Sequence, residues 1–252
     1  MLKPTRLFAL MLLSSALVGA ATRDEVLARL RSQRNATDFT ASGRLVRVSV
    51  SGERSSIPIS FRAHAFPDGL RIFCDVTGPP SGRARVLLCV PPSGPASIRI
   101  GHPGDRSSKE LPVEHWGDRL LGTDFTYEDL LENSVMWRRQ TVLAEAQYGA
   151  RTCIVLRSEP APEDHSQYAS VTSWLDRDIL HPVKVEKVVK STGEVRTFIY
   201  YGLREVKGVW SANQIECRVA GKPGASFLII NRGAEKPHLD RAAFDPSLLT
   251  KP

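Results

Sequence analysis

Apolar and polar residues alternate with a period of two over most of the chain beyond residue 41. Val46, Val48 and Val50 alternate with Arg47 and Ser49, which puts every second side chain on the same face of an extended strand. Gly, Pro, Asn and Asp fill the gaps between such segments, as expected for hairpin turns. The pattern predicts strands over residues 46–50, 57–63, 70–76, 84–90, 98–100, 138–147, 152–157, 168–176, 183–189, 195–201, 210–219 and 227–231.

The number and spacing of these segments predict the architecture. About eleven strands at short intervals, with almost no helical pattern between them, favour an antiparallel succession of strands over alternating βαβ units. The fold class is therefore mainly β, with one large curved antiparallel sheet. Because no linker-like stretch or fixed repeat divides the sequence, residues 21–252 are expected to form a single domain.

A short helix is predicted ahead of the strands. Thr22 and Glu25 have the spacing of a capping box, in which each side chain accepts a backbone N–H from the other residue. Apolar residues at helical spacing follow, so we expect an amphipathic helix over residues 23–34.

The first twenty residues have the pattern of a secretory signal peptide. Lys3 and Arg6 precede an apolar run over residues 7–13, and Val18 and Ala20 lie where a cleavage site requires small residues. The apolar stretch is shorter than the ~20 residues that span a membrane, which favours a cleaved leader over an anchor. Because the residue after the cut is alanine and not a lipoprotein cysteine, a soluble exported protein is expected.

Composition and charge exclude some classes of protein. With 42% hydrophobic and 24% charged residues, the chain is neither disordered throughout nor a multi-span membrane protein. The formal net charge is +7, and loss of Lys3 and Arg6 would leave +5. In an exported protein this excess points to anionic lipid headgroups or other envelope polyanions more readily than to nucleic acid, although a diffuse excess also serves solubility alone.

Four cysteines, Cys74, Cys89, Cys153 and Cys217, follow the predicted leader. A hairpin centred near residues 81–82 would place Cys74 opposite Cys89, leaving Cys153 to pair with Cys217 by elimination. The alternative is four buried free thiols that act as small hydrophobic side chains.

The sequence has none of the usual spacings for metal, cofactor or nucleophile chemistry. Its six histidines form no HxH or HExxH pair, and there is no CxxC, GxSxG or phosphate-loop motif. We therefore expect no metal, no cofactor and no catalytic residues.

The densest carboxylate group consists of Asp124, Glu128 and Asp129, where Asp124 or Thr126 can cap a short helical turn within residues 120–131. Paired carboxylates can perform acid–base chemistry or bind a cation. Acidic residues in the first turn of a helix are also stabilised by its dipole, and this structural explanation is favoured.

Several predicted strands carry apolar residues on both faces. Phe73 and Leu88, for example, lie on strands whose other face carries Ile72 and Leu87. Such a sheet must be covered by another layer or must enclose space. Because only one clear helix is available as cover, a cavity lined by apolar side chains is a plausible hypothesis. The alternative is a closed barrel packed solid.

One segment carries a family resemblance. Residues 122–130, Gly-Thr-Asp-Phe-Thr-Tyr-Glu-Asp-Leu, resemble the G-[ST]-D-F-[ST]-Y-E-D-L signature of outer-membrane lipoprotein-sorting-like proteins, which are relatives of the periplasmic lipoprotein carrier LolA. The downstream order of Cys153, Tyr168, residues 174–176 and residues 181–186 is also similar.

The resemblance extends over about residues 41–249 and implies a fold. That fold is an unclosed antiparallel β-barrel, or half-barrel, in which small lid helices cover a hydrophobic cavity that receives acyl chains. The signature itself is expected to be structural, with Phe125 and Tyr127 pinning the short helix to the sheet edge and Asp124 capping it. The signature residues are Gly122, Asp124, Phe125, Tyr127, Glu128 and Asp129.

The leading functional hypothesis is a non-enzymatic periplasmic carrier that shelters acyl chains of a lipoprotein or a phospholipid. By analogy with the family, cargo would come from an inner-membrane ABC-type permease and pass to an outer-membrane acceptor. An envelope scaffold or lipid sensor that binds a membrane protein is the alternative, and a hydrolase is the third option. Strand parity names the candidate cavity residues Phe61, Phe73, Leu88, Trp174, Phe198 and Phe227.

Overall fold

The computed structural model describes residues 22–78, 82–206, 209–231 and 239–252. The predicted signal peptide, residues 1–20, lies outside the described residues. Among the described residues, no helix combines the length and the apolar character that crossing a membrane would require.

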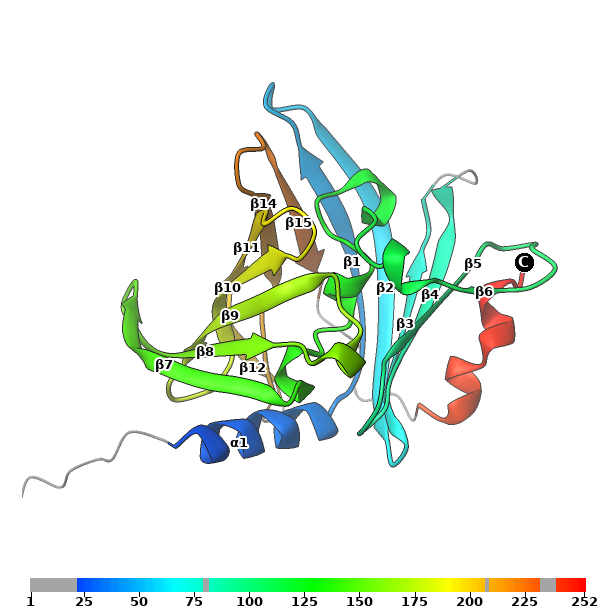
Figure 1. The fold of residues 1–252 in the computed structure, drawn as a ribbon. Coiled ribbons are helices and arrows are strands. Elements are labelled where there is room, and N and C mark those ends of the chain that lie inside the picture. The colour runs from blue at the N-terminus through cyan, green and yellow to red at the C-terminus, as the bar shows by residue number, and fades with distance from the viewer. Residues whose placement is uncertain (1–21, 79–81, 207–208, 232–238) are drawn as a thin grey trace, which may run out of the picture.

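One antiparallel sheet of 13 strands dominates the structure (Figure 1). Its strand order is β6-β5-β4-β3-β2-β1-β15-β14-β11-β10-β9-β8-β7, and no pairing joins the edge strands β6 and β7, so the strongly curved sheet stays unclosed. Its strands are β1 (Asp38–Val48), β2 (Arg54–Phe66), β3 (Gly69–Val76), β4 (Ala84–Val90), β5 (Ser97–Gly101), β6 (Lys109–Glu110), β7 (Arg139–Tyr148), β8 (Arg151–Glu159), β9 (Tyr168–Asp176), β10 (Pro182–Val189), β11 (Val195–Tyr201), β14 (Gln214–Val219) and β15 (Ala225–Ile230).

The prediction of a mainly β, unclosed antiparallel half-barrel is confirmed. The strand count is higher than expected for two reasons. The predicted strand at residues 210–219 divides into β13 (Val209–Ser211), which forms a small separate sheet with β12 (Arg204–Val206), and β14. Both β12 and β6 are too short to show a period of two.

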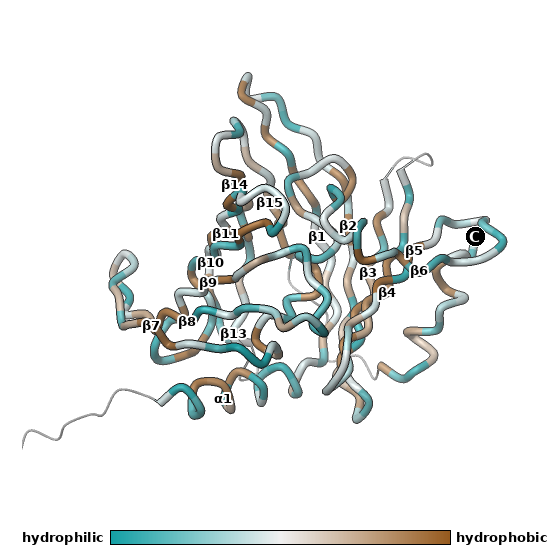
Figure 2. The backbone as a smooth tube through the Cα atoms, viewed as in Figure 1, coloured by the Kyte–Doolittle hydropathy of each residue, from teal (hydrophilic) through white to brown (hydrophobic). Residues whose placement is uncertain are grey.

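The N-terminal helix α1 (Arg23–Asn35) begins as predicted. The hydroxyl of Thr22 accepts the N–H of Glu25, whose carboxylate accepts the N–H of Thr22 at 2.8 Å. Its buried face, Val26, Leu27 and Leu30, packs with apolar residues of β8 and β9. The helix therefore covers one end of the sheet, and Figure 2 shows apolar residues within its otherwise polar coil.

Strand alternation divides the sheet side chains between two faces. On β3 and β4, Cys74 and Leu88 belong to the large apolar cluster of the concave face. Phe73 and Leu87 belong instead to a smaller cluster on the convex face. Two short 3-10 turns near the C-terminus, η7 (Arg241–Phe244) and η8 (Pro246–Leu249), cover this smaller cluster (Figure 1).

The predicted disulfide between Cys74 and Cys89 is wrong, and all four cysteines are free. In the β3–β4 hairpin Cys74 lies opposite Val86, and Cys89 lies opposite Arg71. This register differs from the predicted one by an odd number of residues, which puts the two cysteines on opposite faces of the sheet. Cys153 and Cys217 lie on β8 and β14, which three other strands separate in the sheet.

Candidate functional site

The connection between the edge strands β6 and β7, residues 111–138, lies against the concave face of the sheet (Figure 1). We call it the cover segment. It contains four 3-10 turns, η2 (Val113–His115), η3 (Leu120–Gly122), η4 (Glu128–Leu130) and η5 (Ser134–Met136). The small helices expected over the sheet are therefore present, as isolated turns and not as α-helices.

Large apolar side chains of the cover segment fill the half-barrel. They are at most 4% exposed and share one cluster with the concave faces of the strands. The ring of Phe125, for example, lies 6.0 Å from the ring of Phe198 on β11. These cover residues are Trp116, Leu120, Phe125, Leu131 and Trp137.

The cover segment is tightly folded around the start of the signature. The N–H of Leu120 donates to the carbonyl of Phe125 at 2.7 Å, and the chain reverses through Leu121 and Gly122 at φ of 53° and 73°. A Cβ at position 122 would meet nothing within 4 Å. Glycine is therefore favoured there by the left-handed backbone and not by lack of space.

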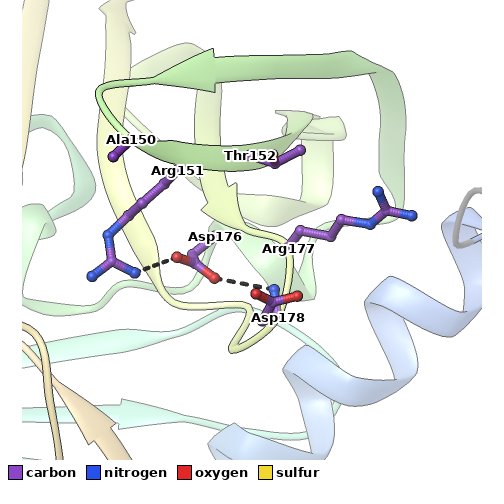
Figure 3. A pocket seen from close by; sticks show the side chains of 6 residues that line it. All are labelled: Ala150, Arg151, Thr152, Asp176, Arg177 and Asp178. Carbon is purple, nitrogen blue, oxygen red and sulfur yellow. Dashed lines mark hydrogen bonds and ion pairs between the residues drawn. The ribbon is translucent and has the colours of Figure 1, made fainter.

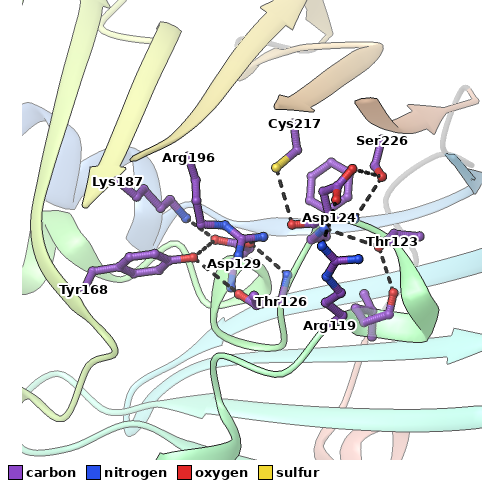
Figure 4. A network of polar contacts seen from close by, with 12 residues as sticks. Arg119, Thr123, Asp124, Thr126, Asp129, Tyr168, Lys187, Arg196, Cys217 and Ser226 are labelled. Carbon is purple, nitrogen blue, oxygen red and sulfur yellow. Dashed lines mark hydrogen bonds and ion pairs between the residues drawn. The ribbon is translucent and has the colours of Figure 1, made fainter. Parts of the chain in front are cut away.

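Asp129 connects the cover segment to interior strands of the sheet (Figure 4). Its carboxylate accepts hydrogen bonds from the Tyr168 hydroxyl at 2.6 Å and from the Lys187 ammonium at 2.9 Å, and the Arg196 guanidinium lies 3.8 Å away. These partners come from β9, β10 and β11. Burial alone would raise the pKa of Asp129, but Lys187 and Arg196 hold it below its usual value.

Glu128 makes a second connection, to the loop before β9. Its carboxylate accepts a hydrogen bond from the hydroxyl of Ser166 and another, at 2.8 Å, from the N–H of Gln167. Glu128 is only 3% exposed. Burial raises its pKa to about 7, against the lowering effect of these two hydrogen bonds.

Asp124 makes a third connection, to β15 and β14 (Figure 4). The Ser226 hydroxyl donates to its carboxylate at 2.8 Å, and its own N–H donates to that hydroxyl oxygen at 2.8 Å. The Cys217 thiol donates to the carbonyl of Asp124 at 3.4 Å, and Arg119 pairs with its carboxylate at 3.7 Å.

The capping role predicted for Asp124 is therefore wrong. Thr126 and Asp129 instead close the turn, since the Thr126 hydroxyl accepts the N–H of Asp129 and the Asp129 carboxylate accepts the N–H of Thr126. Phe125 holds the turn against the interior strand β11, whereas the sheet edge was expected. Tyr127 is half-buried and packs against the concave cluster.

Sequence patterns did not single out the sheet partners of these carboxylates. Lys187 and Arg196 lie on the apolar face of β10 and β11, two residues from Val185 and Phe198 and therefore on the same face. A charged residue on an apolar stripe was the signal available in the sequence, because such a side chain requires a buried partner.

The six candidate cavity residues do not share one face. Phe61, Leu88 and Phe198 lie on the concave face. Phe73 faces the C-terminal turns, on the convex side. Trp174 lies opposite Lys184 in the strand register, and the Lys184 ammonium is 4.3 Å from the centre of the Trp174 ring. Both residues are out of phase with the concave residues of β9 and β10 and therefore lie on the other face.

Phe227 also lies out of phase, because its neighbours Val46 and Glu216 alternate with the concave residues Leu45 and Cys217. The expectation that all six residues line one cavity therefore does not match the structure. Alternation within a strand indicates which residues share a face, but it does not indicate which face is concave.

Two pockets occur among the described residues, an open one with a mainly polar lining and a very small one lined by both polar and apolar side chains. An open pocket of about 830 Å³ lies beside the β7–β8 turn (Figure 3), where Arg151 pairs with Asp176 and the N–H of Asp178 donates to Asp176 at 3.0 Å. A very small cavity of about 10 Å³ lies between the cover segment and the sheet, near Trp137 and Lys187. Within the described ranges, no three His, Cys, Asp or Glu side chains are grouped as metal ligands.

Comparisons with known proteins give one family match and several solved structures with the same fold. A protein family described as uncharacterised matches residues 102–251, more than half of the chain and including the whole cover segment. No curated protein matches the chain.

Three solved bacterial structures share the fold. A domain assigned to outer membrane lipoprotein sorting from Vibrio parahaemolyticus is 18% identical, with a TM-score of 0.77 over 88% of this chain and 96% of that chain. A DUF1329 family protein from Desulfovibrio piger is 13% identical, with a TM-score of 0.78 over 90% and 97%. A LolA superfamily protein from Nitrosomonas europaea is 16% identical, with a TM-score of 0.71 over 91% and 100%.

Proposed function

Because the chain belongs to this family of uncharacterised proteins and has the LolA-like fold, we propose that it is a non-enzymatic carrier or binding protein for acyl chains. The cargo is the acyl part of a lipoprotein or a lipid. The concave face of the sheet receives it after the cover segment moves away.

The observation that carries this proposal is the way in which the concave face is filled. Its apolar strand residues contact side chains of an irregular connection, chiefly Trp116, Leu131 and Trp137, and not a second sheet or a long helix. An acyl chain gains about 0.8 kcal/mol for each CH₂ group that it buries. An acyl chain bound on this face therefore offsets the apolar contacts that are lost when the cover segment moves away.

The cover segment is also built from elements that separate readily. Single 3-10 turns lack the cooperative hydrogen bonding of a long helix. Leu121 and Glu132 have φ of 53° and 43°, and backbone strain at such residues is relieved when the segment changes conformation.

The proposed setting is the periplasm, after cleavage of the leader. The signal-peptide pattern of residues 1–20 and the excess of basic residues support export and peripheral contact with anionic membranes. An inner-membrane ABC-type permease is the proposed donor and an outer-membrane protein the proposed acceptor, in a role in lipoprotein sorting. No nucleic-acid partner is proposed.

Native mass spectrometry of the protein purified from its own envelope tests this function. The expected result is bound mass that organic extraction recovers as phospholipid or acylated peptide. Protein that is empty on isolation and also fails to take up a fluorescent fatty acid would overturn the carrier proposal. Because the concave face is already packed, that result would favour the alternative role as an envelope scaffold.

A reversible lock tests whether the cover segment must move. The Asp124 carboxylate and the Ser226 hydroxyl are 2.8 Å apart, so the two positions are candidates for a disulfide, which requires Cβ atoms about 4 Å apart. All variants carry Cys217→Ser, because Cys217 lies opposite Ser226 in the strand register and could pair with a cysteine there. We expect the oxidised double variant D124C/S226C to lose uptake of the fluorescent fatty acid and to recover it on reduction. The single variant S226C is the matched control, and equal uptake by the oxidised and reduced double variant would contradict movement of the segment.

A further inference from the structure

We propose that Lys187 and Arg196 form a binding site for the anionic group of an amphiphilic ligand, and that Asp129 occupies this site while the cover segment is closed. The inference rests on the proposed carrier function and names the chemical class of the cargo. That class is a lipid with a carboxylate or phosphate at the end of its acyl chain or chains.

The two cations are direct neighbours in the sheet. Lys187 on β10 lies opposite Arg196 on β11 in the strand register. They are 9% and 6% exposed and lie on the concave face beside Val185 and Phe198. Like charges directly opposite each other destabilise a sheet, and the cost rises where apolar neighbours exclude water. The pair therefore requires an anion.

A single carboxylate meets this requirement only in part. Asp129 accepts a hydrogen bond from Lys187 at 2.9 Å, but its nearest approach to Arg196 is 3.8 Å. The Nε and Nη2 atoms of Arg196 are buried and have no hydrogen-bond partner among the residues that the structure describes. Of the other acids nearby, Glu128 is engaged by Ser166 and Gln167, Glu194 pairs with Lys222, and Glu132 is exposed.

The donors stay on the sheet when the carboxylate leaves. Tyr168, Lys187 and Arg196 belong to β9, β10 and β11, whereas Asp129 belongs to the cover segment. Movement of that segment would leave two cations and a hydroxyl converging on one point, without Asp129, the one carboxylate among the described residues that pairs with both cations. An incoming anionic group restores the pairing, whereas an uncharged acyl ester or alcohol does not.

The donor set matches a carboxylate or a phosphate. A guanidinium offers paired N–H donors to planar or tetrahedral anions, and the lysine and tyrosine add charge and a third donor. Phe198 and Val185 continue the same face, so an acyl chain attached to the anion has an apolar surface beside it. The geometry thus suits an anionic headgroup and its chain together.

Matched ligands with and without the charge test the inference. Oleate is compared with oleyl alcohol, and phosphatidylglycerol with diacylglycerol of the same chains, by fluorescence displacement on the full-length mature protein. We expect at least one anionic ligand to bind about tenfold more tightly than its uncharged partner, the size of effect expected for charge-assisted hydrogen bonds. The first pair reports recognition of a carboxylate and the second reports recognition of a phosphate.

Substitutions test which residues cause the preference for anionic over uncharged ligands. Lys187→Met is expected to abolish the preference for the anionic ligand, and Lys187→Arg to retain it. Lys184→Met is the control, because Lys184 is on the same strand but out of phase, over the ring of Trp174. Asp129→Asn removes the resident charge and is expected to raise affinity for oleate more than for oleyl alcohol.

The outcomes separate the two proposals. Binding of charged and uncharged ligands with equal affinity would overturn the anion site and leave the carrier function standing. Retention of the full preference in a folded Lys187→Met protein would also overturn the site. Failure of every ligand to bind would overturn both. The comparison of wild-type affinities needs no variant, so a Lys187→Met protein that does not fold leaves the test intact.

Discussion

Two short segments cover the same sheet from opposite faces, and they are held by different interactions. The cover segment fills the concave side and contributes three buried carboxylates, Asp124, Glu128 and Asp129. The C-terminal turns pack Phe244 and Leu249, both 0% exposed, against the convex face.

The C-terminal turns use their charges at the surface. Asp240 and Asp245 cap η7 and η8 from exposed positions, and the arginines that reach these turns bond to backbone carbonyls. Arg62 donates to the carbonyl of Ala243, and Arg85 donates to that of Leu248. Gly101 lets Leu249 approach β5 closely, because a Cβ at that position would be 2.9 Å from the Leu249 carbonyl oxygen.

The difference indicates which cover is permanent. The C-terminal turns are held by apolar contacts, and their capping carboxylates are exposed. Their removal would lose these contacts and would free no buried ion that a ligand could pair with. A cover held by buried ions is stable only while each ion keeps its partner, because an unpaired buried charge is costly. Under the proposed function, the concave cover is therefore conditional on what occupies the site of Asp129, whereas the convex cover remains part of the core.

The largest effect is expected from Asp129→Ala. It leaves Lys187 and Arg196 buried without their anion, so the free energy of unfolding is expected to fall by about 3–5 kcal/mol. Chemical denaturation measures this change. Asp118→Ala, an exposed acid of the same segment, is the control and is expected to change stability by less than about 0.5 kcal/mol. Equal effects from the two substitutions would remove the distinction between the covers.

Leu249→Ala tests the convex cover. Loss of this fully buried side chain leaves a cavity in the convex cluster and is expected to cost about 2–5 kcal/mol of stability. Uptake of a fluorescent fatty acid should be unchanged at a temperature where the variant is folded. Leu248→Ala, at a partly buried neighbour, should cost less. Impaired uptake in folded Leu249→Ala would show that the two covers are coupled.

Glu128 makes stability depend on pH in a definite direction. Its pKa is raised by burial from an ordinary value of 4.5 to about 7, so the folded state holds a proton that the unfolded state has lost. The stability that this group contributes is fully present below pH 4.5. It declines as pH rises from 4.5 to 7, by up to about 1.4 kcal/mol for each pH unit. Denaturation midpoints at several pH values measure the decline.

Glu128→Gln resembles the protonated acid and is expected to remove this part of the pH dependence. The difference between the two proteins isolates Glu128 from His181, whose pKa burial lowers and whose stability contribution changes in the opposite direction. A difference that does not vary between pH 4.5 and 7 would show that the carboxylate is ionised in the folded protein.

The smallest effect is expected from reducing agent. Because the four cysteines are free, a thiol assay in denaturant without reductant should find four thiols in each chain, and reductant should leave the denaturation midpoint unchanged. A count of two or none, or a midpoint lowered by reductant, would restore the disulfide hypothesis.

Much of the fold was predictable because it depends on local periodicity. The capping box of Thr22 and Glu25 fixed the start of α1, and period-two alternation located most strands to within a few residues. What alternation could not give was register. The cysteine pairing failed because Cys89 lies opposite Arg71, in a hairpin whose turn pattern allowed more than one centre.

The candidate site was predictable only in part. The nine-residue signature pointed to the correct stretch of chain, yet the roles expected for Asp124, Glu128 and Asp129 were those of local caps and a helix dipole. Their partners Ser226, Ser166 and Lys187 are 38 to 102 residues away in sequence, beyond the reach of any local pattern. The six cavity candidates failed as a set because alternation within a strand does not indicate which face of the sheet is concave.

By itself the sequence determined the class of the protein: a long run of alternating strands, one capped helix and a basic, cysteine-containing chain with a leader pattern. Alternation and capping depend on neighbours within a few residues, so they are visible in one dimension. Only the tertiary structure decided which face curves inward, that residues 111–138 fill it, and that Asp129 meets Lys187 and Arg196 there. Curvature and buried ion pairing depend on strands far apart in the chain, and their energies exist only once those strands are assembled.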